Sequence, residues 1–71
     1  MMKVEYGRYI IEVFSYRSGG KWRPDIRISR RSGDGVHTEQ LPAPESVVLD
    51  SPAESDAYGV QVAKEVIDSR G

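Results

Sequence analysis

The 71-residue sequence has no cysteine and a single histidine, His37. The absence of cysteine excludes disulfides, thiolate metal ligands and cysteine nucleophiles. One histidine alone excludes histidine-based metal clusters and relay pairs. No apolar run approaches the length of a membrane span, and the first six residues lack the apolar core of a signal peptide. We therefore expect a single domain over residues 1–71, located in the cytoplasm and without membrane association.

The chain also offers little that would support catalysis. None of its serines lies in a nucleophile elbow or near a plausible base. Asp50, Glu54 and Asp56 cluster where a helix is expected to begin, and the helix dipole favours negative charge there for structural reasons. Their spacing does not match a calcium-binding loop. We expect no catalytic residue, no metal site and no cofactor, and interpret the protein as a non-enzyme.

The clearest pattern predicts a C-terminal helix over residues 51–68. Ser51 suits the N-cap, Pro52 the first helical position, and Glu54 completes a capping box. At about 100° per residue, small and aliphatic side chains share one face: Gly59, Val60, Ala63, Val66 and Ile67. Because glycine in a helix costs about 1 kcal/mol relative to alanine, we interpret Gly59 as a point where the helix closely approaches a sheet.

Three strands are predicted before this helix, over residues 4–16, 22–31 and 36–41, from their apolar and polar alternation. Turns at residues 18–21 and 32–35 join them, since glycine adopts positive φ without steric cost. Trp22 is expected to be the largest anchor of the core. Pro24 lacks an N–H group and is expected at an edge, at a bulge or at the beginning of its strand.

The remaining segments connect and terminate these elements. Residues 42–45 contain two prolines and predict an extended connector. Residues 47–49 are expected to pair briefly as a fourth strand, and Gly71 to mark the helix stop. The predicted fold is therefore α+β, in the order β-β-β-α, with a three-stranded antiparallel sheet, a short fourth strand left open as an alternative, and one helix on one face.

Charge is unevenly distributed, although the net charge is only −1. Residues 8–31 carry seven basic and two acidic side chains, a balance of +5, whereas residues 32–71 carry two basic and eight acidic ones, a balance of −6. Such asymmetry indicates an anion-binding face, complementarity within or between chains, or simply solvated charges on opposite surfaces.

Four basic residues are the candidates for contact with nucleic acid or another anion. Arg23, Arg27 and Arg31 alternate on one face of the strand predicted over residues 22–31, and Lys21 precedes them. Arginine forks suit phosphate, and strands can enter a major groove. The acidic net charge and the interrupting Asp25 favour an ordinary solvated face instead.

A second candidate surface is apolar. Ile10, Phe14 and Tyr16 share one face of the first predicted strand, and together they would form a patch for a partner protein or a second copy of the chain. Our first interpretation is a small accessory domain that binds protein or self-associates. The alternative is nucleic-acid binding through the basic outer face of residues 22–31.

Residues 9–13 (YIIEV), 20–28 (GKWRPDIRI) and 49–54 (LDSPAE), followed by Gly59, Ala63 and residues 66–68, resemble small bacterial βββα domains of unknown function. The resemblance covers nearly the whole chain and implies a fold and a bacterial cytoplasmic setting. A looser likeness to the AP2-like N-terminal domains of phage integrases implies a sheet that reads DNA with Arg23 and Arg27. The acidic balance and the prolines at positions 42 and 44 depart from that second pattern.

Overall fold

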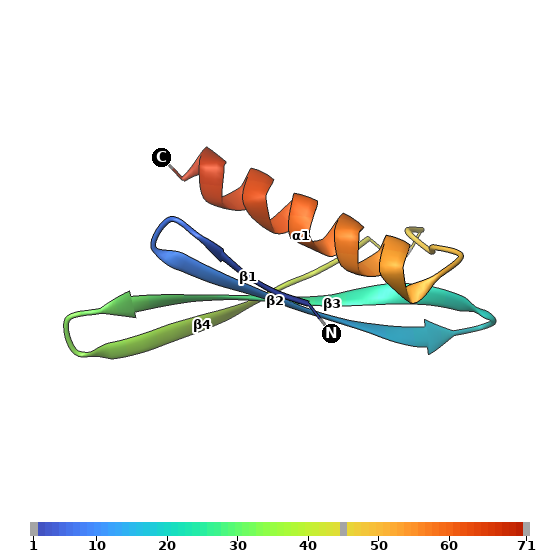
Figure 1. Ribbon diagram of the computed structural model, residues 1–71, viewed down its shortest axis with the longest axis horizontal. Coiled ribbons are helices and arrows are strands. Elements are labelled where there is room, and N and C mark those ends of the chain that lie inside the picture. Colours follow the sequence, from blue (N-terminus) through green and yellow to red (C-terminus); the bar gives the residue numbers. More distant parts are fainter. Residues whose placement is uncertain (1, 45, 71) are drawn as a thin grey trace.

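The computed structural model describes residues 2–44 and 46–70. Its elements, in chain order, are β1 (Met2–Tyr6), β2 (Tyr9–Ser18), β3 (Lys21–Ser32), β4 (Gly35–Leu41) and α1 (Pro52–Ser69). The strands form one antiparallel sheet in the order β1-β2-β3-β4, and α1 lies across one of its faces (Figure 1). The predicted α+β fold is therefore confirmed. Glu45 of the predicted connector and Gly71, the predicted helix stop, lie outside the described residues.

The fourth strand comes from the N-terminal stretch. Gly7 has a φ of 61° and lies in the turn between β1 and β2, so the stretch predicted as one strand forms a hairpin in which Val4 pairs with Ile11. Residues 47–49 contribute a single bridge: the N–H of Leu49 donates to the carbonyl of Trp22 at 2.8 Å, and the N–H of Trp22 donates back at 2.9 Å.

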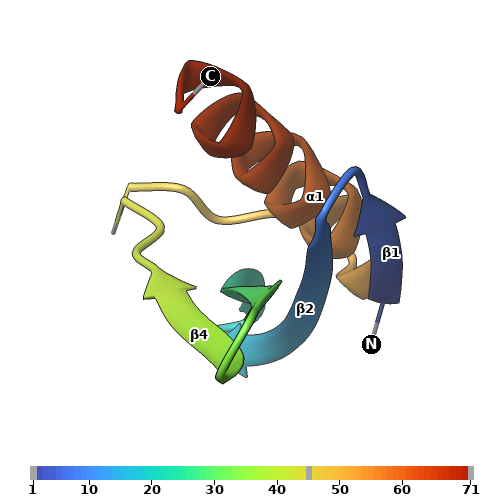
Figure 2. The ribbon, with the colours of Figure 1, turned by 90° about the vertical axis from the view of Figure 1, so that its left-hand side faces the viewer.

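The hairpin between β2 and β3 turns on two glycines. Gly19 and Gly20 have φ values of 59° and 81°, the positive pair that a two-residue type I′ turn requires. The turn predicted over residues 18–21 is thus confirmed. The sheet curls toward one side, and α1 lies on its concave face (Figure 2).

The apolar core lies between α1 and the centres of β2 and β3. Its strand residues are Ile11, Val13, Ile26 and Ile28, each no more than 2% exposed; Leu41, Val60 and Ala63 complete it. Trp22, expected to be the largest anchor, is only half-buried and lies outside this cluster. It pairs with Arg17 near the tip of the β2–β3 hairpin, which extends past the beginning of α1 (Figure 1).

α1 approaches the sheet most closely at Gly59. A Cβ atom at this position would lie 2.6 Å from Cγ1 of Val13 and 3.2 Å from Cβ of Pro24, distances at which atoms overlap. One turn later, Ala63 is completely buried. The close approach predicted from these two small residues is confirmed, and the helix backbone lies directly against β2 and β3.

Pro24 lies in β3, a central strand of the sheet, at a position where β3 has no hydrogen-bonded neighbour on the side away from β2. The N–H of Trp22 points away from β2, toward Leu49, and positions two apart in a strand direct their N–H groups the same way. The pairing with β4 begins only at Ile26. The missing N–H of Pro24 therefore falls in the gap between the Leu49 bridge and β4, where the ladder needs no donor.

The beginning of α1 is fixed by its cap and by an acidic side chain. The N–H of Glu54 donates to Oγ of Ser51 at 3.1 Å, which confirms the predicted N-cap. The hydroxyl of Ser15 on β2 donates to the carboxylate of Asp56, which is 9% exposed. Within the described residues, no helix combines the length and apolar composition needed to cross a membrane.

Gly59→Ala should lower the free energy of unfolding, by up to about 2 kcal/mol. Overpacking costs roughly 1–3 kcal/mol, and the better helix propensity of alanine returns about 1 kcal/mol. Urea denaturation followed by circular dichroism measures the change. The penalty should shrink in a Val13→Ala background, where the clashing Cγ atoms are absent. Exposed Ala57→Gly, the control, reports helix propensity alone. A Gly59→Ala variant more stable than the native chain would contradict the close approach.

Candidate functional site

The sheet face opposite α1 collects the candidate residues of the sequence. Strand register and alternation place these side chains on it: Ile10, Glu12, Phe14 and Tyr16 from β2, Arg23, Asp25, Arg27, Ser29 and Arg31 from β3, and Val36, Thr38 and Gln40 from β4. We call this surface the open face. It is convex, because α1 occupies the concave side (Figure 2). The apolar and the arginine candidates therefore share one surface.

Two aromatic side chains dominate the apolar part of the open face. Phe14 and Tyr16, adjacent on this face of β2, are 44% and 45% exposed. Ile10 is half-buried and is separated from them by Glu12. The predicted patch is thus an aromatic pair with a more distant isoleucine.

Two of the four basic candidates are held by their own chain. Lys21 forms an ion pair with Asp50 at the end of the connector, and this contact raises the pKa of the lysine and lowers the pKa of the carboxyl. Nη2 of Arg23 donates to the carbonyls of Ala43 and Pro44, at 3.4 Å each. These contacts tie the segment after β4 to the beginning of β3, which is a structural role.

The other two arginines are more available. Arg27 lies 3.7 Å from one oxygen of Asp25, whose other oxygen accepts a hydrogen bond from Gln40 at 2.7 Å. Arg27 also lies directly opposite Glu12 in the register. The side chain of Arg31 is exposed and forms no hydrogen bond or ion pair with the described residues. The open face thus carries both charge signs rather than a purely basic stripe.

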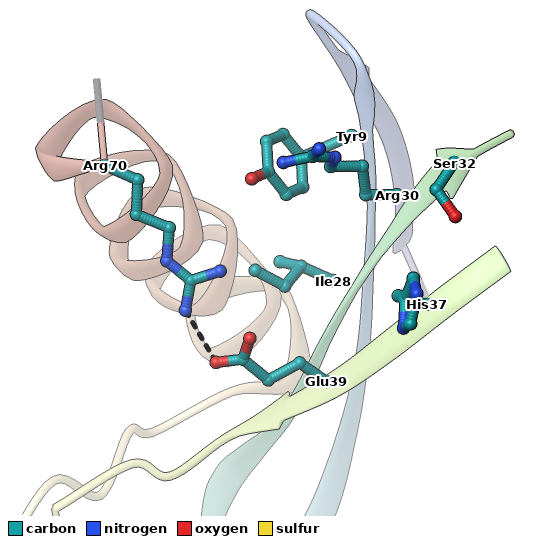
Figure 3. A pocket seen from close by; sticks show the side chains of 7 residues that line it. All are labelled: Tyr9, Ile28, Arg30, Ser32, His37, Glu39 and Arg70. Atoms are coloured by element: carbon teal, nitrogen blue, oxygen red, sulfur yellow. Dashed lines mark hydrogen bonds and ion pairs between the residues drawn. The ribbon is translucent and has the colours of Figure 1, made fainter.

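A pocket that the sequence analysis did not predict lies on the other side of the sheet. It has a volume of about 320 Å³ and is bounded by β2, by the β3–β4 hairpin and by the end of α1 (Figure 3). Ile28 forms its apolar base, and polar side chains surround it: Tyr9, Arg30, Ser32, His37, Glu39 and Arg70.

Two guanidinium groups set the electrostatics of this pocket. Nη2 of Arg70 donates to Oε2 of Glu39 at 2.6 Å, which lowers the pKa of Glu39. The pKa of Tyr9 is also lowered, mainly by its hydrogen bond with Arg30 and to a smaller extent by its hydrogen bond with Arg70. The site therefore stabilises negative charge at the Tyr9 hydroxyl.

One signal in the sequence pointed toward this pocket. Side chains alternate between the two faces of a strand, and Arg30 falls on the face opposite that of Arg27 and Arg31. Its side chain therefore lies on the α1 side of the sheet, beside Tyr9, its partner in the register. The pairing of Glu39 with Arg70 joins positions 31 residues apart. Such a contact depends on where the helix ends relative to β4, which local patterns do not specify.

No family model, no curated protein and no solved structure matches this chain. The resemblances to bacterial βββα domains and to AP2-like domains stay predictions.

Tyr9 should ionise at a lower pH than Tyr6. The guanidinium groups near Tyr9 stabilise its phenolate and lower its pKa, whereas Tyr6 donates to Oδ1 of Asp68 at 2.7 Å, and this hydrogen bond raises the pKa of Tyr6. Tyrosine Cζ shifts followed by NMR across the alkaline range measure both. Arg30→Gln should raise the pKa of Tyr9 and leave that of Tyr6 unchanged.

The lowered pKa of Tyr9 determines how this residue makes the free energy of unfolding depend on pH. An acid with a depressed folded-state pKa stabilises the fold only as pH rises through that pKa toward the unfolded value. Below the folded-state pKa, where Tyr9 is protonated in both states, the shift contributes nothing to stability. If Tyr9 ionised together with Tyr6 or after it, the two guanidinium groups would not act on the phenol as described.

Proposed function

We propose that this chain is a small protein-interaction module that self-associates through its open face. The observation that carries the proposal is the exposed pair Phe14 and Tyr16, at 44% and 45%, on a sheet surface that is polar apart from these two residues, Ile10 and Val36. Exposed aromatic residues are enriched in the centres of protein interfaces. The binding role is non-catalytic, and a bacterial cytoplasm, which is reducing, suits a chain without cysteine.

Charge complementarity favours a second copy as the partner. Consider a two-fold axis that runs parallel to the strands, between β2 and β3, in the plane of the interface. Because β2 and β3 then exchange places, Glu12 of each copy lies over Arg27 of the other, and Tyr16 lies over Arg23. An axis perpendicular to the strands, at the level of this pair, instead places Arg27 over Arg27 and Glu12 over Glu12. The parallel axis is therefore the favourable one.

The shape of the sheet agrees with this axis and limits the strength of the dimer. Two convex faces touch along a ridge, here the central strands β2 and β3 (Figure 2). A contact restricted to two strands per copy falls in the small-interface class, below about 1,200 Å². We accordingly propose a weak dimer, with a dissociation constant on the order of micromolar to millimolar.

The small core gives self-association a physical benefit. The buried apolar cluster of the described residues contains seven side chains, and domains of this size are marginally stable alone. Any partner that binds the folded state only raises its stability by mass action. Burial of Phe14 and Tyr16 between two copies adds apolar area that one copy leaves in water.

Nucleic-acid binding through the same face is the second candidate. It is supported by Arg31, whose side chain is exposed and has no ion pair with the described residues. Lys21, Arg23 and Arg27 already contact groups of their own chain. Binding to phosphates would require these contacts to break, so the dimer is preferred.

Charge reversal at the two complementary positions should abolish and then restore association. Glu12→Arg alone and Arg27→Glu alone should each weaken the dimer by roughly tenfold or more, because like charges then face each other across the axis. An equimolar mixture of the two variants should associate, since the arginine introduced in one chain then meets the glutamate introduced in the other. Sedimentation equilibrium measures all three samples.

The double variant Glu12→Arg/Arg27→Glu is the control for pairing across the axis, because it keeps a Glu–Arg pair between β2 and β3 and the self-complementarity, although it loses the contact of Arg27 with Asp25. It should dimerise like the native chain. Monomeric behaviour of the native chain at millimolar concentration would reject the proposal. Amide shifts on β3 during titration with short duplex DNA, strongest at low salt, would then favour the nucleic-acid alternative.

A further inference from the structure

The pocket at the C-terminal end of α1 has the volume needed for a small ligand. Tyr9, Arg30 and Arg70 line both the pocket of about 320 Å³ and an adjoining hollow of about 740 Å³. Small-molecule sites typically occupy about 300–1,000 Å³. The pocket lies on the α1 side of the sheet, opposite the open face, so that the two surfaces can be tested independently.

Positive charge exceeds negative charge around this space. Among the described residues that line the pocket, Glu39 is the only carboxylate, and it is paired with Arg70 at 2.6 Å. Arg8 and Asp68 line the adjoining hollow, one of each sign. Arg30 forms no ion pair with a carboxylate of the described residues. One guanidinium charge therefore faces the pocket without a counter-charge.

Donors reach the pocket from three elements. Arg30 comes from β3, His37 from β4 and Arg70 from the end of α1, and they surround the space above Ile28 (Figure 3). Converging donors suit a phosphate group, whose oxygens point in several directions, and guanidinium groups match phosphate geometry closely. The Ile28 side chain and the Tyr9 ring supply apolar contact for the rest of a ligand.

We propose that this pocket binds a small phosphate-bearing molecule, with Arg30 as its main contact and with Arg70 and the Tyr9 hydroxyl as further contacts. Ile28 lies beneath the apolar part of the ligand. The lowered pKa of Tyr9 supports this assignment, because the two guanidinium groups that cause it stabilise an anion beside the phenol. No covalent step is involved.

NMR titration with phenyl phosphate tests the proposal. At constant ionic strength, phenyl phosphate should cause saturable shifts of the Arg30 and Arg70 Nε–H signals and of the Ile28 methyl groups. Inorganic phosphate should bind the same residues more weakly, since it lacks the ring. Benzyl alcohol, which carries the ring without the charge, should cause no saturable shift at either arginine.

Two variants that differ by one position give a matched comparison. Arg30→Gln should weaken phenyl phosphate binding at least tenfold. Arg31→Gln removes the same charge from the open face and should leave the affinity unchanged. An equal loss of affinity in both variants would show that only the net charge matters and would overturn the proposal. NMR shifts that increase linearly with phenyl phosphate concentration, without saturation, would also overturn it.

A third variant guards against loss of the fold. If Arg30→Gln failed to give the dispersed amide spectrum of the native chain, Arg70→Gln would provide the comparison. This substitution leaves Glu39 without its partner, so the freed carboxylate should repel phosphate and weaken binding by a similar factor. Unchanged affinity in a folded Arg70→Gln or Arg30→Gln variant would contradict the site.

Discussion

The close contact of Gly59 with Val13 and Pro24 determines how deeply α1 lies on the sheet. Because no Cβ separates the helix backbone from these side chains, the two completely buried side chains one turn before and one turn after Gly59 are also small: Ser55 and Ala63 are both 0% exposed. A helix this close to β2 and β3 needs few large side chains to fill the space beneath it. Seven aliphatic side chains, four of them from β2 and β3, are therefore enough to form the buried cluster of the described residues.

Both candidate surfaces follow from this thin, one-sided core. The helix covers only the centre of the concave face, and so the β3–β4 hairpin extends beyond its C-terminal end (Figure 1). On the α1 side of this hairpin, the side chains line a pocket and do not pack into the core. Three of them are polar: Arg30, His37 and Glu39. With α1 on the concave side, the aromatic pair Phe14 and Tyr16 stays exposed on the convex one.

Local patterns predicted the elements that depend on local chemistry. The Ser51 cap and the Gly19–Gly20 turn were predicted because a cap and a two-residue hairpin each have a characteristic sequence. The split at Gly7 was missed, since apolar residues continue on both sides of the turn. Trp22 was misplaced because its size suggested burial, whereas it lies near the tip of the β2–β3 hairpin, which extends past the beginning of α1 (Figure 1). The pocket depends on tertiary contacts such as Glu39 with Arg70, which no local pattern encodes.

Thermal unfolding as a function of protein concentration tests most directly whether the one-sided core is completed by a second copy. For a chain whose folded state self-associates, mass action raises Tm as concentration increases. We predict such a rise over roughly a hundredfold range up to millimolar concentration, and a flat profile for Arg27→Glu. A Tm that is independent of concentration for the native chain would contradict the account and leave the open face as a solvated surface.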